Sequence, residues 1–266
     1  KIGIDPANQR RMMNESLDVI IALMRGETIT RKTDWFDLRD AVLQLPPYTR
    51  PRMEMAVAAA RSPVGALAAG RHGLGMLSIG GTSDEALVHH ANNWDLYAAT
   101  ATENGHVPDR RNWRLVTHFH IAETREKARE NVQFGLDKYC DYFRDVATFP
   151  IVPGDITDRY QYMVESGSAC IGTPDDAIAF IERLLKGSGG FGVIMELAHN
   201  WADWAETKRH YELMARYVHP HFQSSREWRN ESYAFARSHH DEYTGQSGAA
   251  VQAEIDRLAA KRRAAE

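Results

Sequence analysis

The sequence predicts an α/β protein built on a parallel β-sheet. Short apolar runs alternate along the chain with longer segments of helical periodicity. The first of these runs, residues 53–60, is apolar except for Glu54, which suits a parallel strand covered on both faces. Alternating strands and helices also favour right-handed crossovers, so an open doubly wound sheet and a (β/α)8 barrel both fit. We expect four strands, near residues 53–60, 74–79, 112–121 and 191–198.

A helix and a turn-rich segment precede the first strand. Asp5 and Pro6 predict the start of a helix that ends near residue 25, because aspartate caps helices and proline suits the first helical position. Residues 27–48 are rich in β-forming and turn residues. We interpret them as a hairpin or an excursion between this helix and the next strand.

A strand, a tight turn and a helix form the central unit of the sequence. After residues 53–60, Ser62 is expected to cap a helix that Pro63 begins, and the helix ends near residues 70–73. Such a turn is a ready anion site, because backbone N–H groups and the positive end of the helix dipole point outward. Taken alone, it can hold any phosphate or nothing.

Cap signals place the later helices. Thr82, with a glutamate three residues later, forms a predicted capping box for a helix over residues 83–104. Thr173 is expected to cap a helix that ends near residue 186. We expect further helices over residues 124–143 and 201–217, and an irregular stretch over residues 144–170.

Two domains are expected. Residues 1–222 hold the strand and helix signals of the α/β core, and residues 223–266 form a C-terminal helical extension. The last twenty residues carry Val251, Ile255 and Leu258, a spacing that suits a surface helix or a partner-binding arm.

Composition narrows the class of protein. The formal charge of the 266 residues is −4, so no overall attraction to nucleic acid is expected. No apolar run reaches the roughly 18–20 residues that a spanning helix needs, and we expect no membrane partner. Only Cys140 and Cys170 occur, which favours a reducing compartment, the cytoplasm, over a disulfide framework. The chain begins with Lys1, and we expect a further N-terminal part in the natural protein.

Several polar features are candidates for chemistry. His118 and His120 alternate on one face of a predicted strand, as two metal ligands can. No cysteine or carboxylate has a supporting spacing, so we predict no metal and favour a lining role inside the fold. Glu196 lies within the last strand, and a buried carboxylate is either paired structurally or functional. Neither a G-x-G-x-x-G fingerprint after a strand nor a G-x-S-x-G elbow is present.

Five segments together resemble the C-terminal half of the bacterial luciferase-like, flavin-dependent monooxygenases. They are DPANQRRMMNESLDVIIALMRG, TRKTDWFDLRDAVLQLPP, AVAAARSPVGALAAGRHGLGML, ACIGTPDDAIAFIERLL and GFGVIMELA, and the match covers about residues 5–222. Within that family, the length and the loop DRYQYMVESG are most similar to the limonene-type terpene monooxygenases.

The resemblance implies a (β/α)8 barrel of which this chain supplies about the last four strands, followed by the helical tail. The first four strands are expected upstream of Lys1, and the catalytic residues with them, so those residues stay unknown. Half a barrel on its own would expose two sheet edges and apolar faces, which favours aggregation or pairing with another half.

The resemblance also implies a reduced flavin, FMN or FAD, at the C-terminal face of the barrel. Its phosphate is expected on the turn formed by Ala60, Arg61, Ser62 and Gly65. Ser62 would offer its hydroxyl and N–H, Arg61 would add charge, and Gly65 would leave room for close approach. Ser78, at the end of the next strand, is expected to approach the same cofactor.

The implied reaction inserts one oxygen atom from O2 into a small apolar organic substrate, with the flavin carrying the difficult chemistry. His199, Asn200 and Trp201 follow the last strand and are expected to line the substrate pocket. A separate reductase would supply reduced flavin, and a homo-oligomer is expected. Two alternatives stay open: a deazaflavin-dependent oxidoreductase that moves a hydride on the same barrel, and a non-catalytic barrel subunit.

Overall fold

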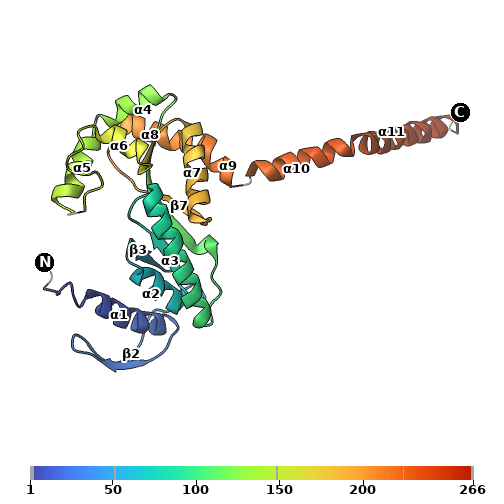
Figure 1. Ribbon diagram of the computed structural model, residues 1–266. Coiled ribbons are helices and arrows are strands. Elements are labelled where there is room, and N and C mark those ends of the chain that lie inside the picture. Colours follow the sequence, from blue (N-terminus) through green and yellow to red (C-terminus); the bar gives the residue numbers. More distant parts are fainter. Residues whose placement is uncertain (1–2, 51, 148, 224, 265–266) are drawn as a thin grey trace. The chain divides into compact units, whose positions relative to one another are not determined.

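The computed structural model describes residues 3–50, 52–147, 149–223 and 225–264 (Figure 1). The chain divides into two compact units, residues 1–211 and 212–266, which we describe separately. The predicted domain boundary at residue 222 stays a prediction, because a division by contacts does not test independent folding.

The N-terminal segment forms a helix and a hairpin. Helix α1 (Gln9–Met24) begins after Asn8, a little later than predicted, because Asp5 accepts the Ala7 amide in a preceding turn. Strands β1 (Ile29–Lys32) and β2 (Asp37–Ala41) pair antiparallel. The predicted hairpin is therefore confirmed.

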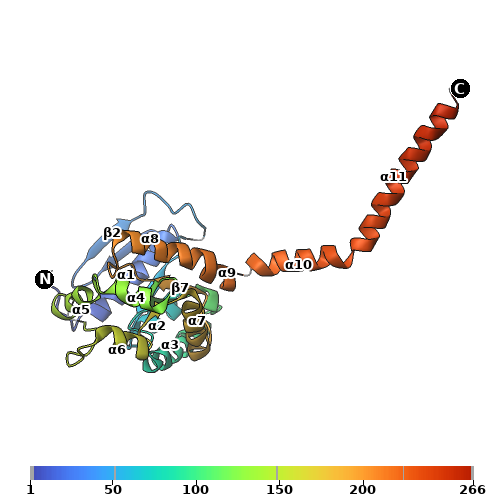
Figure 2. The ribbon, with the colours of Figure 1, turned by 90° about the horizontal axis from the view of Figure 1, so that it is seen from above.

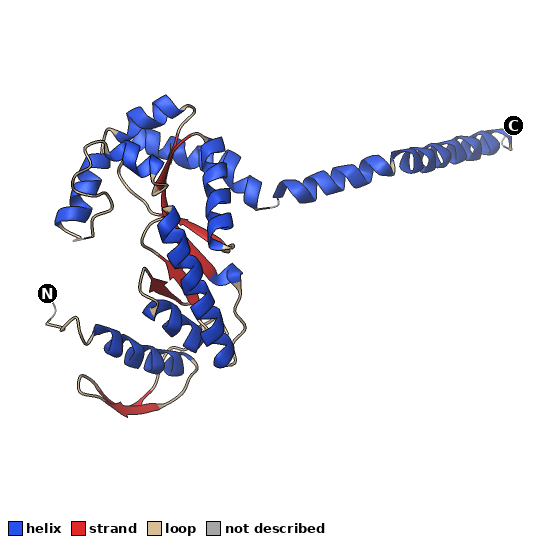
Figure 3. Cartoon of the chain, in the orientation of Figure 1, coloured by secondary structure: helices blue, strands red, loops and turns tan. Residues whose placement is uncertain are grey.

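The four predicted strands of the parallel sheet are all present (Figure 3). Strand β3 (Ala56–Ala59) pairs with β4 (Gly75–Ser78), and β4 pairs with the start of β5 (Trp113–Ile121). Strand β7 (Val193–Glu196) pairs with residues 114–117 of β5. All pairings are parallel, so the C-terminal ends of the strands lie at one edge of the sheet.

A fifth parallel strand was not predicted. Strand β6 (Ala169–Gly172) pairs with the last four residues of β5, from His118 to Ile121. The interpretation of residues 144–170 as irregular was wrong here, and helix α6 (Arg159–Glu165) also lies in that stretch. All four residues of β6 are buried, so the strand has no polar–apolar alternation, and it is too short to stand out in the sequence.

Helices α2 (Val64–His72) and α3 (Asp84–Glu103) cover one face of β3, β4 and β5. The two helices approach closely at Gly70, where a Cβ would lie only 2.7 Å from the Tyr97 carbonyl oxygen. The lack of a side chain at Gly70 permits this approach. Trp94 of α3 stacks on Trp113 of β5 with ring centroids 5.0 Å apart, which anchors α3 on the sheet.

The cap predictions had mixed outcomes. Helix α7 (Pro174–Ser188) begins with the predicted capping box at Thr173. The box predicted at Thr82 is wrong, because Ser83 caps α3 and accepts the Ala86 amide. Thr82 is instead buried, where its hydroxyl donates to the Gly167 carbonyl and contacts the Thr117 hydroxyl at 3.0 Å. Because its hydroxyl contacts two partners in the core, Thr82 does not cap α3.

The helix predicted over residues 124–143 is two helices, α4 (Arg125–Val132) and α5 (Leu136–Asp145). The break lies at Gly135, whose absent Cβ would be 1.9 Å from the Asn200 carbonyl oxygen. The Gly135 amide donates to the Trp201 carbonyl at 3.1 Å. Glycine therefore lets the start of α5 contact the segment that follows β7.

A short 3₁₀-helix (Arg110–Asn112) precedes β5.

The chain division falls within α8 (Trp204–Leu213). The second unit continues through a π-helical turn (Met214–Val218) to three further helices (Figure 2). These are α9 (His219–Phe222), α10 (Ser225–Ser238) and α11 (His240–Arg263). The helical tail is confirmed. Among the residues that the structure describes, no helix combines the length and hydropathy needed to cross a membrane.

Candidate functional site

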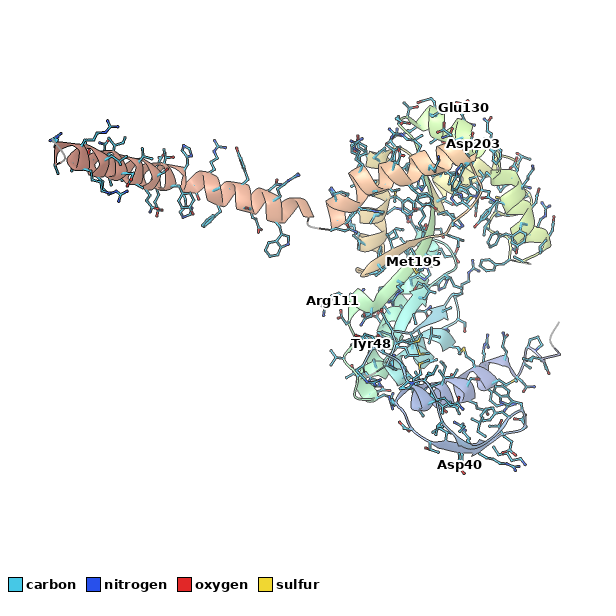
Figure 4. The ribbon with its side chains drawn as sticks, turned by 180° about the vertical axis from the view of Figure 1, so that it is seen from behind. Asp40, Tyr48, Arg111, Glu130, Met195 and Asp203 are labelled. Atoms are coloured by element: carbon cyan, nitrogen blue, oxygen red, sulfur yellow. The ribbon has the colours of Figure 1, made fainter. Side chains whose placement is uncertain are left out.

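Two of the predicted site segments follow strands of the parallel sheet at its C-terminal edge. Residues 60–65, which we call the Ser62 turn, follow β3. Residues 197–203 follow β7; Figure 4 labels Met195 in β7 and Asp203 at the end of this segment. In α/β barrels this edge carries the functional loops.

The Ser62 turn is held in place by α3. The side-chain amide of Asn93 donates to the Ala60 carbonyl oxygen at 2.7 Å, and Asn93 is almost fully buried. The Ile79 amide, just beyond β4, donates to the Ala59 carbonyl at 2.9 Å. The exit of β3 is thus fixed from both sides, although Asn93 carried no signal in the sequence.

The predicted cap at Ser62 is wrong, because Pro63 occupies the N-cap position of α2 and no side chain caps the helix. The first-turn amides of α2 therefore have no side-chain acceptor. The half-buried Ser62 hydroxyl and the exposed Arg61 guanidinium have no hydrogen-bond or ion-pair partner among the described residues. The turn presents unpaired donors only, which suits an anion.

Gly65 is explained by packing within the fold. A Cβ at this position would lie 2.0 Å from the Ala58 carbonyl oxygen, so any side chain would push α2 away from β3. Gly65 is buried as the second residue of α2. Its predicted contact with a cofactor stays a prediction, and it would come through the backbone.

Ser78 has a partner inside the core. Its side chain is fully buried, and its hydroxyl accepts a hydrogen bond from the Trp113 indole at 2.9 Å. This bond satisfies the buried indole nitrogen of the Trp94–Trp113 stack. The predicted contact of Ser78 with the flavin stays a prediction.

A groove of about 680 Å³ lies between α5, the segment after β7 and α8. We call it the His199 groove. His199 and Asn200 line it, and their predicted contact with a substrate stays a prediction. Trp201 was also expected to line the pocket, but it is fully buried and is not among the lining residues. The other lining residues are Phe134, Gly135, Lys138, Tyr139, Ala198, Trp204, Thr207 and Tyr211.

His199 is fixed as a neutral ring beside the groove. Its Nε2 donates to the Phe119 carbonyl oxygen at 2.9 Å, and its Nδ1 accepts the Trp201 amide at 3.4 Å. Its ring stacks on the Trp201 indole at 3.9 Å. Burial lowers the pKa of His199 to about 3, so the ring is uncharged near neutral pH.

His118 and Tyr139 form a second part of the wall. The Tyr139 hydroxyl is hydrogen-bonded to Nε2 of His118 at 2.9 Å. The His118 ring also stacks on Trp201 at 5.4 Å. Burial lowers the pKa of His118 to about 4 and raises that of Tyr139, so both groups are neutral.

A buried network lies behind the groove. His210 of α8 accepts the Ile121 amide on Nδ1 at 3.0 Å and donates from Nε2 to Glu196. Of the two alternatives expected for Glu196, the structure shows the structural pairing. His120 stacks on His210 at 5.4 Å, and its Nε2 accepts from the Asn131 amide. Burial lowers the pKa of His120 to about 4.

The structure therefore assigns His118 and His120 to a hydrogen-bonded wall. Among the described residues, no group of three or more His, Cys, Asp or Glu side chains is placed to hold a metal ion. Tyr139 and His210 were not predicted as site residues, because the sequences of their helices indicate only amphipathic packing. The one available clue was Glu196, a strand carboxylate that required a partner.

Comparisons with known proteins identify the family of the chain. The sequence profile of the luciferase-like monooxygenases matches residues 1–190. Limonene 1,2-monooxygenase of Rhodococcus erythropolis is 39% identical over 83% of this chain and 57% of its own length. The 4-hydroxyprotoasukamycin monooxygenase of Streptomyces nodosus subsp. asukaensis is 36% identical over 88% and 64%, respectively.

A solved structure shares the fold. It is the oxygenating constituent of 3,6-diketocamphane monooxygenase from Pseudomonas putida, in complex with FMN. The TM-score is 0.62, with 23% identity over 82% of this chain and 66% of that chain. The present chain spans about three fifths of the length of the curated relatives it matches. The profile match and the identity to the curated relatives establish that the chain belongs to the luciferase-like monooxygenase family.

Proposed function

We propose that the protein is a flavin-dependent monooxygenase that uses reduced flavin and O2 to insert one oxygen atom into a small apolar organic substrate. The Ser62 turn carries this proposal. It combines the uncapped start of α2 with an unpaired hydroxyl and an unpaired guanidinium at the C-terminal edge of the sheet. Membership of the family supports a flavin phosphate as the anion.

The chain's own residues fit a phosphate. First-turn amides of α2 would donate to its oxygens, the Ser62 hydroxyl would add a donor, and Arg61 would balance its charge. Asn93 would keep the turn in place through the Ala60 carbonyl. FMN supplies the reaction with O2 when bound. FMN is proposed over FAD because it is the flavin named for the structural relative.

The His199 groove would receive the organic substrate. Its aromatic lining and the neutral histidines behind it suit an apolar molecule, because no buried charge would be desolvated on binding. The side-chain amide of Asn200 is exposed at the groove and would orient a polar substituent. Trp201 would act indirectly, by holding the His199 ring through stacking.

A separate reductase would supply reduced flavin, and the protein would work as a homo-oligomer in the cytoplasm. The two buried cysteines are free thiols, which is consistent with a reducing compartment.

The test is oxygen consumption by the protein with chemically reduced FMN and a cyclic terpene such as limonene. We expect substrate-dependent formation of a product that carries one 18O atom from 18O2, and a clear loss of that product with Ser62→Ala. Ser83→Ala, a cap serine of α3, is the matched control. Binding of FMN without any oxygenated product, over a range of apolar substrates, would contradict the proposal.

A deazaflavin would fit the same turn, because the turn recognises a phosphate and not a ring. Hydride transfer without oxygen consumption would favour that alternative. A non-catalytic subunit would bind neither cofactor, and its effect would appear only on mixing with a partner protein.

A further inference from the structure

We propose that α11 pairs in antiparallel orientation with α11 of a second copy of this chain. The helix carries three large apolar side chains on one side, Val251, Ile255 and Leu258, each about half exposed or more. Their spacing of four and three residues places them on one face. No described residue of α11 is buried.

In the N-terminal half of α11, the same face carries small side chains. Thr244, Ser247 and Gly248 follow the stripe backwards at helical spacing. They line a shallow groove of about 550 Å³ on the helix, together with Tyr243, Val251 and Gln252. An antiparallel copy would place Ile255 and Leu258 over this groove, so large side chains would meet small ones at both ends. A parallel copy would set large against large and small against small.

The charges at the two ends of α11 favour the same orientation. The first turn carries Asp241 and Glu242, and the last turn carries Lys261, Arg262 and Arg263. Antiparallel pairing brings each acidic end beside the basic end of the other copy, whereas parallel pairing brings like charges together. Opposite charges at flanking positions are the usual means of setting helix orientation.

The composition of α11 also indicates a need for burial. Gly245 and Gly248 lie inside a 24-residue helix, and glycine weakens a helix relative to alanine. Helices in proteins obtain most of their stability from packing of an apolar face. Within its own unit α11 has no buried residue, so a second copy would supply that packing.

The first test measures the mass of the full chain by sedimentation equilibrium over a range of concentrations. We expect a dimer whose dissociation constant rises at least about tenfold in the double variant Ile255→Asp/Leu258→Asp. Ala253→Asp, on the opposite face of α11, should leave the constant unchanged. A monomer at all concentrations, or an unaltered dimer in the double variant, would overturn the proposal. Circular dichroism of each variant checks that the rest of the chain stays folded.

The second test fixes the orientation. Asp241→Cys and Arg262→Cys variants are prepared separately, and disulfide formation is followed alone and after mixing. The antiparallel pair predicts cross-linking chiefly between the two different variants, and weaker association at high salt. Efficient cross-linking within each variant alone would show a parallel pair and contradict the inference.

Discussion

The Ser62 turn and the His199 groove lie at the same edge of one sheet but are built in different ways. The turn is a local feature, in which one strand exit and one helix start present backbone amides, a hydroxyl and a guanidinium. The groove is assembled from β5, α5, β7 and α8 through rings and hydrogen bonds. A few consecutive residues therefore define the turn that we propose as an anion site, whereas the groove requires residues that lie far apart in the sequence.

Both regions depend on a glycine that permits close backbone approach, and substituting these glycines should have the largest effect. Gly65→Ala would place a Cβ 2.0 Å from the Ala58 carbonyl oxygen, and Gly135→Ala one 1.9 Å from the Asn200 carbonyl oxygen. Each should lower the free energy of unfolding by about 3 kcal/mol, measured by urea denaturation. Gly154→Ala, with open space around it, is the control.

The two glycine variants should also separate the functions of the two regions. Gly65→Ala should weaken flavin binding more than substrate binding, and Gly135→Ala should do the reverse. Equal stability of either variant and wild type would show that the close approach is not required.

We expect loss of the buried network to disturb the His199 groove and to leave the Ser62 turn unchanged. His210→Phe removes the acceptor of the Ile121 amide and the partner of Glu196, so a buried amide and a partly buried carboxylate lose this hydrogen bond. We expect a loss of about 2–3 kcal/mol in the free energy of unfolding. The exposed His240→Phe should be neutral. A normal melting temperature for His210→Phe, with unchanged substrate affinity, would argue against the network.

Acid should destabilise the groove region. The folded protein holds His118, His120 and His199 with pKa values lowered to about 3–4, while the unfolded chain binds protons near pH 6.5. Below pH 6.5 the unfolded state therefore binds more protons, and stability falls as the pH drops toward 4. Each histidine contributes at most about 1.4 kcal/mol per pH unit.

Urea denaturation between pH 7 and pH 4.5 measures this dependence. His199→Asn should flatten the curve relative to wild type, and His240→Asn should not. A pH-independent stability of the wild-type protein across this window would contradict the neutral state of the three rings.

Tyr139→Phe should have the smallest effect. It removes one hydrogen bond to Nε2 of His118 and keeps the ring in the groove wall, so we expect a loss of about 1 kcal/mol in stability. Isothermal titration with the apolar substrate should show a change of only a few-fold in affinity. Tyr142→Phe, on an exposed tyrosine of the same helix, is the matched control. A large loss of turnover with intact binding would instead assign the hydroxyl a role in the reaction.

The fold was largely predictable because its signals are local. Four strands, the hairpin and the Thr173 capping box follow from apolar runs and cap residues in sequence. Strand β6 was missed because four buried residues carry no periodicity, and the break at Gly135 because its cause lies at Asn200, far along the chain. The predicted cap at Ser62 was wrong because α2 begins one residue later than expected, at Val64, which places Pro63 at the N-cap.

The parts of the candidate site that are formed by consecutive residues could be predicted from the sequence, and the parts that are formed by tertiary contacts could not. The position of the Ser62 turn followed from a strand, a serine and a proline, but its support by Asn93 did not. His199 and Asn200 were expected at a groove because they directly follow a strand, and they line one, while their contact with a substrate stays a prediction. Tyr139 and His210 belong to the same wall through tertiary contacts alone, and no local pattern distinguishes them from other helix residues.

We propose that the Ser62 turn binds the phosphate of a flavin, and the affinities of the protein for FMN and for riboflavin decide whether it does. The two ligands differ only in the phosphate, so their dissociation constants, measured by fluorescence quenching, isolate its contribution. We predict that FMN binds at least about tenfold more tightly, and that Arg61→Ala/Ser62→Ala removes most of this difference. Equal affinities for the two flavins, or a preference for FMN that survives in the double variant, would contradict phosphate binding at the Ser62 turn.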